Sequence, residues 1–158
     1  MTRRDSTHED DPQRTPPWDI EKLRPEEIAG ELRATERWVE RLRGLWGRRV
    51  PACWYFHQDL GLALIAARIE WAERIEKGGA RSIYAFLGDD LKRLILEPLA
   101  SPIGDGENTH RVPGSEAHRK VNTRDLGDSV EAFLDSPWFG WIWCGVTPPA
   151  PAEGHGDV

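Results

Sequence analysis

Cys53 and His57 are the one closely spaced pair of thiol and imidazole side chains in the sequence. The C-x3-H spacing places them about one helical turn apart, and both side chains are ligands that Zn²⁺ prefers. Cys144, His110 and His118 would complete a tetrahedral set. Structural zinc sites usually contain two close pairs of ligands, and this chain has one. A zinc-stabilised helical domain is therefore the last of three hypotheses.

A packed turn explains the same residues without a metal ion. A free cysteine is among the residue types most often buried in a protein core. Under this interpretation Cys53, Trp54 and Phe56 fill the gap between two helices. His57 then caps the following helix or bonds to a backbone group. Both interpretations stay open from the sequence.

Catalytic motifs are lacking. A nucleophilic Cys53–His57 pair would need a third orienting group and an oxyanion hole, and neither is predicted. The sequence contains no G-x-x-x-x-G-K-[ST], G-x-G-x-x-G, H-E-x-x-H or G-x-S-x-G. We therefore expect a protein that is not an enzyme and that has no cofactor other than the zinc ion considered above.

Tryptophan is unusually frequent, with eight residues in a chain of 158. An indole buries a large area and still needs a hydrogen-bond partner for its N–H group. Trp38, Trp46 and Trp71 lie in helical register with other apolar residues, and we expect them in the core. The rings are too numerous for interior filling alone, so we expect some of them to contact another molecule.

Aromatic residues concentrate in the block WFGWIWCGV near the end of the sequence. A contiguous aromatic surface usually marks a binding site, because aromatic anchors dominate interaction hot spots. The first hypothesis is therefore a non-enzymatic interaction module that binds a protein partner or a second copy of itself. The residues expected to form its surface are Trp138, Phe139, Trp141 and Trp143.

A basic stretch at 33–49, with six Arg and two Glu, contrasts with the net charge of −6. The acidic balance disfavours non-specific contact with phosphate backbones. Basic residues beside aromatic rings can nevertheless hold single strands by charge and stacking. A small nucleic-acid-binding accessory protein is thus the second hypothesis. Its candidate residues are Arg41, Arg43, Arg48 and Arg49, although cations also suit the C-terminal end of a helix.

Two long helices are predicted from the recurrence of apolar residues. In 25–46 these residues repeat at intervals of 4, 3, 4, 3 and 4, and Pro25 is suited to the first helical position. A second helix is predicted for 58–77; its middle is apolar nearly all round, so it should be the most buried. The aromatic segment 51–57 connects the two.

Two further helices are predicted with less regular patterns. One covers 81–96, where Gly88 is expected to break or kink it and Pro98 to end it. The other covers 124–135. The aromatic block that follows is too short to assign to a helical turn or to a strand.

The fold expected is all-α, a small bundle of three or four helices in a single domain at 18–147 with a long loop at 98–122. The polar, Pro-rich arm at 1–17 and tail at 148–158 are expected to be disordered. No segment has the length and apolarity of a membrane span, and the first residues do not resemble a secretory signal. With two cysteines, a cytoplasmic location is the default expectation.

The run VPACWYFHQDLGLALIAARIEW resembles a family of small, Trp-rich actinobacterial proteins without an assigned activity, encoded on plasmids, integrated elements and phages. The shared motif is V-x-x-C-W-Y-x-H between two Trp-containing helices, and the likeness covers about residues 36–75. Gln58 stands where the family commonly has proline. The resemblance implies an accessory protein of a mobile element, and it assigns no catalytic residue. The matching residues are Val50, Cys53, Trp54, Tyr55, His57 and Trp71.

Overall fold

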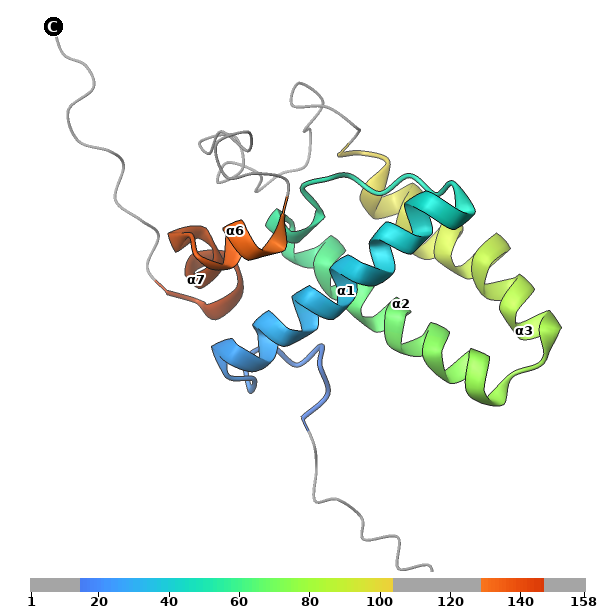
Figure 1. Ribbon diagram of the computed structural model, residues 1–158, viewed down its shortest axis with the longest axis horizontal. Coiled ribbons are helices and arrows are strands. Elements are labelled where there is room, and N and C mark those ends of the chain that lie inside the picture. Colours follow the sequence, from blue (N-terminus) through green and yellow to red (C-terminus); the bar gives the residue numbers. More distant parts are fainter. Residues whose placement is uncertain (1–14, 104–128, 147–158) are drawn as a thin grey trace, which may run out of the picture.

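The computed structural model describes residues 15–103 and 129–146. Within these ranges the chain forms helices and no strand, which confirms the all-α class. Two long helices cross near the middle of the molecule, a third runs antiparallel beside the second, and two short helices lie at one end (Figure 1). Among the described residues, no helix combines the length and apolarity needed to cross a membrane.

The two long helices, α1 (Pro25–Trp46) and α2 (Gln58–Lys77), have the bounds that the apolar periodicity predicts. At the start of α1 the Glu27 carboxylate accepts a hydrogen bond of 2.8 Å from the Arg24 amide. At its end Gly47 adopts a φ of 59°, a conformation that a residue with a side chain adopts at a cost.

A polar clamp joins α1 and α2. Arg68 of α2 forms an ion pair with Glu31 of α1, and its Nε donates to the Thr35 hydroxyl at 3.2 Å. Thr35 is fully buried, so Arg68 supplies the partner that its hydroxyl needs. The clamp ties α2 to α1 on the N-terminal half of α1.

The third helix is longer than predicted and largely π-helical. It runs through α3 (Ala80–Ala85), η2 (Phe86–Asp90) and η3 (Lys92–Ala100). The predicted end at Pro98 is wrong, since the helix continues to Ala100, and residues 98–100 do not belong to the loop. Gly88 lies inside η2 and does not break the helix.

The side chains that this helix buries account for its wider turns. Phe86, Leu91 and Leu96 are buried at intervals of five residues, which matches the i to i+5 hydrogen bonds of a π-helix. Beyond Pro98, the amide and the hydroxyl of Ser101 both donate to the Leu96 carbonyl, at 2.7 and 2.9 Å. An α-helical period, on which the prediction rested, does not apply to this segment.

The connector between α1 and α2 is a packed turn. Its 3-10 helix η1 (Trp54–Phe56) buries all three aromatic rings. The rings of Tyr55 and Phe56 lie against that of Phe133, with centroids 5.0 and 4.7 Å apart. The connector thus forms the part of the core on which the short helices pack.

Two short helices, α6 (Val130–Leu134) and α7 (Pro137–Cys144), close this end of the bundle. The terminal aromatic block is therefore helical rather than a strand. Ser129 is extended and caps α6 by accepting from the Ala132 amide at 3.2 Å. The helix begins at Val130 after this extended cap, and residues 124–128 of the predicted helix lie outside the described residues.

Charged side chains of α1 hold α6 in place. The Glu36 carboxylate accepts from the Val130 amide at 2.7 Å. The Arg33 guanidinium donates to both carboxylate oxygens of Glu131, at 2.5 and 3.3 Å. This pairing raises the pKa of Arg33 and lowers the pKa of Glu131.

Trp143 anchors α7 on α2. Its side chain is 2% exposed, and its indole N–H donates to the Tyr55 carbonyl at 2.7 Å. Gly61 of α2 makes room for the ring, since a Cβ there would lie 2.5 and 2.6 Å from two of its carbons. The position of α7 therefore depends on a glycine in the middle of the bundle.

We predict that Gly61→Ala lowers the free energy of unfolding by about 1–3 kcal/mol, because the added methyl group overlaps the buried Trp143 ring. Urea denaturation followed by circular dichroism measures the change. Gly30→Ala in α1 is the matched control, since a Cβ there meets nothing within 4 Å. Alanine is the better helix former, so the control should be stabilised by up to about 1 kcal/mol. An equal change in the free energy of unfolding in the two variants would contradict the packing of the Trp143 ring against Gly61.

Candidate functional site

The structure divides the four residues of the expected aromatic surface between the core and the surface. The assignment of Trp143 to a binding surface is wrong, because one side of the short helix α7 must pack on the bundle and Trp143 lies on that side. Trp138, Phe139 and Trp141 are partly exposed. Three of the four residues therefore stay available for a partner, to different degrees.

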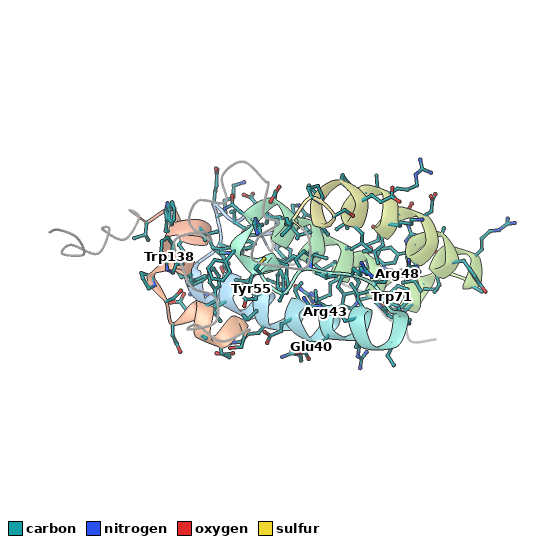
Figure 2. All side chains as sticks on the ribbon, turned by 90° about the horizontal axis from the view of Figure 1, so that it is seen from above. Glu40, Arg43, Arg48, Tyr55, Trp71 and Trp138 are labelled. Atoms are coloured by element: carbon teal, nitrogen blue, oxygen red, sulfur yellow. The ribbon has the colours of Figure 1, made fainter. Side chains whose placement is uncertain are left out.

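Trp138 and Trp141 form an aromatic pair on α7, with ring centroids 5.2 Å apart. Phe139 instead contacts the core, where its ring lies 6.1 Å from that of Phe133. Figure 2 shows Trp138 at this end of the molecule, far from Arg48 and Trp71. The two indoles of the pair are thus the part of α7 that can offer aromatic surface to another molecule.

A groove of about 710 Å³ opens beside this pair, and we name it the α7 groove. Its walls come from three parts of the chain: the segment before α1, the first turns of α2, and the second half of α7. Trp18, on one wall, is 51% exposed. The apolar side chains that line the groove include Trp18, Ile20, Leu23, Leu62, Trp141 and Ile142.

Of these lining residues, only Trp141 belongs to the aromatic surface predicted from the sequence. The segment Trp18–Leu23, with the sequence WDIEKL, places three apolar residues among charged ones directly after a Pro-rich arm. These apolar residues are the signal that could have indicated a packed segment. Nothing in the sequence indicates that it lies beside α7, because the two are far apart in the chain.

A hydrogen bond between α2 and α7 fixes the floor of the groove. The Gln58 side-chain amide donates to the Ile142 carbonyl at 3.0 Å. Both residues line the groove, as does the anchored Trp143. The second half of α7 is therefore held at two points, and the wall that carries Trp141 is preformed.

The rim of the groove is acidic. Asp19 and Glu21 both line it, and Asp19 pairs with Lys22 at 3.1 Å. Cys144 lines the groove as well. Burial raises the pKa of the Cys144 thiol, and the negative charge of Glu26 raises it further. A positive charge that enters the groove would meet this surplus of carboxylates.

The structure brings Cys53 and His57 together but does not add Cys144. The Cys53 Sγ lies 3.6 Å from the His57 Nε2, and the His57 ring is buried. Across residues 15–103 and 129–146, no three Cys, His, Asp or Glu side chains are grouped to hold a metal ion. His110 and His118 lie outside the described residues, so the zinc hypothesis stays a prediction.

The four candidate arginines for nucleic acid have different environments. Arg43 donates to the Val50 carbonyl through Nε and Nη2, at 3.0 and 2.7 Å. Arg48 donates to the carbonyl of Leu87 at 2.7 Å. Both side chains thus hold backbone segments together. Arg41 and Arg49 are exposed.

Comparisons with protein-family models, with curated proteins and with solved structures found no match. The function of the chain must therefore be argued from its own geometry. The α7 groove combines a cavity of about 710 Å³ with the exposed Trp18, the partly exposed Trp141 and two acidic lining residues, Asp19 and Glu21.

We predict that Cys144 reacts slowly with iodoacetamide near neutral pH, because the thiolate is the reactive form and burial and Glu26 favour the neutral thiol. Its alkylation rate should rise at higher pH than that of free cysteine. Peptide mapping by mass spectrometry between about pH 7 and pH 10 distinguishes it from Cys53. Glu26→Gln should move the profile slightly toward lower pH. If the alkylation rate of Cys144 depends on pH in the same way as that of free cysteine, the raised pKa of its thiol is refuted.

Proposed function

We propose that this protein is a non-enzymatic interaction module whose α7 groove binds an apolar, positively charged helix of a partner protein. The observation that carries the proposal is the groove itself, in which Trp18 and Trp141 line an open cavity with acidic residues at its rim. Trp138 extends the aromatic surface beside it, since its ring lies 5.2 Å from that of Trp141.

The apolar lining supports a helix as the occupant. An amphipathic helix binds a groove through apolar side chains on one of its faces, spaced three or four residues apart. Exposed indoles at such a site are typical hot-spot residues, because they remove a large apolar area from water upon binding.

The charge of the rim supports a cationic partner. Asp19 and Glu21 line the groove, and Glu26 acts on Cys144 within it. The whole chain carries a net charge of −6, which attracts a basic segment at long range. Complementary charge mainly raises the association rate and the specificity of such a contact. The resemblance to accessory proteins of mobile elements adds a proposed context, in which the partner is encoded by the element or its host.

The test uses two synthetic helical peptides with the same leucine positions, one with lysine at its polar positions and one with glutamate. We expect the Leu/Lys peptide to bind and to shift the emission of the exposed indoles. Trp141→Ala should weaken this binding by about 30-fold, as expected for a hot spot worth 2 kcal/mol. Helicity should be unchanged, because Trp141 is only partly buried.

Tyr84→Ala is the matched control, since Tyr84 is an aromatic residue that is 80% exposed and lies on the third helix. It should bind the Leu/Lys peptide like the unmodified chain. Asp19→Asn with Glu21→Gln should weaken binding and reduce its dependence on salt. Equal binding of the Leu/Glu peptide, or equal loss in the Tyr84 variant, would refute the proposed groove.

A further inference from the structure

A second cavity lies on the opposite side of the bundle from the α7 groove. It has a volume of about 300 Å³ and is lined by Arg48, Ile83, Tyr84, Leu87 and Gly88. Arg48 follows the end of α1, and the other four residues belong to α3 and η2. Figure 2 places Arg48 far from Trp138, so the two cavities are separate sites.

The guanidinium of Arg48 is partly buried and lacks a counter-charge. Its Nη2 donates to the Leu87 carbonyl at 2.7 Å, while its Nε is closed off from solvent without a hydrogen-bond partner. No ion pair involves Arg48 within the described part of the chain. A charge taken partly out of water in this way is costly until an anion approaches it.

The nearest acidic residues along the chain are engaged elsewhere. Asp89 pairs with Arg93 at 3.0 Å, and Asp90 pairs with Arg74 at 2.8 Å. Asp89 and Asp90 are the two residues after Gly88 in η2. Each carboxylate has an arginine partner of its own, and the guanidinium of Arg48 keeps donors for a ligand.

The other residues that line the cavity indicate the chemistry of the part of the ligand that does not contact Arg48. Ile83 and Leu87 are aliphatic, and Tyr84 brings a highly exposed ring with a hydroxyl group. A Cβ on Gly88 would meet open space, so no protein atom fills the volume beside it. The π-helical turn that carries Gly88 also places the Leu87 carbonyl against Arg48, and such turns are frequent at functional sites.

We infer that this cavity, the Arg48 pocket, binds a small organic carboxylate with a branched aliphatic or aromatic body. A planar guanidinium matches the geometry of a carboxylate, which can accept two hydrogen bonds from it. The apolar walls would cover the body of the ligand. A cavity of about 300 Å³ lies at the lower end of the size range of small-molecule sites, which excludes a large cofactor.

The test compares 4-methylpentanoate and benzoate with their uncharged amides on the full chain, by NMR titration. We expect both acids to bind with dissociation constants of about a millimolar or lower, and the amides to bind at least tenfold more weakly. The Arg48 Nε–H signal should shift with the acids alone. N-acetyl-alanyl-leucine tests whether the carboxylate ligand is the C-terminus of a peptide. A lower dissociation constant for this peptide than for 4-methylpentanoate would identify a peptide C-terminus as the ligand.

Arg48→Gln should lower the affinity for the acids by at least tenfold, whereas Arg41→Gln, which removes an exposed arginine of α1, should leave it unchanged. Gly88→Leu keeps Arg48 and fills open space, so it should retain helicity and still weaken binding at least fivefold. Equal affinity for acids and amides would overturn the inference. An affinity for the acids that is unchanged in both Arg48→Gln and Gly88→Leu would also overturn the inference.

Discussion

The attachment of α7 rests chiefly on one buried side chain, the indole of Trp143. Its ring occupies the space that Gly61 leaves on α2, and its N–H bonds to the Tyr55 carbonyl in the aromatic connector. One residue thereby links the last helix to both the centre and the connector of the bundle. The α7 groove depends on this contact, because Trp141 and Ile142 stand on the same two turns as the anchor.

The two ends of the bundle have opposite chemistry. At one end, Asp19 and Glu21 line a groove whose walls also carry Trp18 and Trp141, and this groove is suited to a basic segment. At the other, Arg48, which forms no ion pair among the described residues, lines a small apolar pocket that is suited to an anion. Figure 2 shows Arg48 and Trp138 toward opposite ends of the molecule, so the two sites lie on different parts of the bundle.

The sequence predicted the helices correctly where apolar residues repeat with the α-helical period along the whole helix. The bounds of α1 and α2 follow from unbroken apolar repeats with clear start and stop residues. The third helix departs from prediction because its inward side chains recur every five residues, a period that a search for α-helices does not detect.

The candidate site was predictable only in part. Trp138 and Trp141 could be recognised as a surface pair, yet the choice of Trp143 as the anchor depends on a glycine of a distant helix. The α7 groove joins three separate segments, so no local pattern contains it. Likewise, the pairing of Arg48 with the Leu87 carbonyl follows from tertiary contact alone.

The contacts that fasten α1 to its neighbours differ in their response to acid. The links from Arg43 and Arg48 run to neutral backbone carbonyls and involve no carboxylate. The link between Arg33 and Glu131 contributes above the ordinary pKa of a glutamate and is lost as the pH falls through the lowered pKa of Glu131. In a strongly acidic medium, α6 would therefore lose this charged attachment to α1.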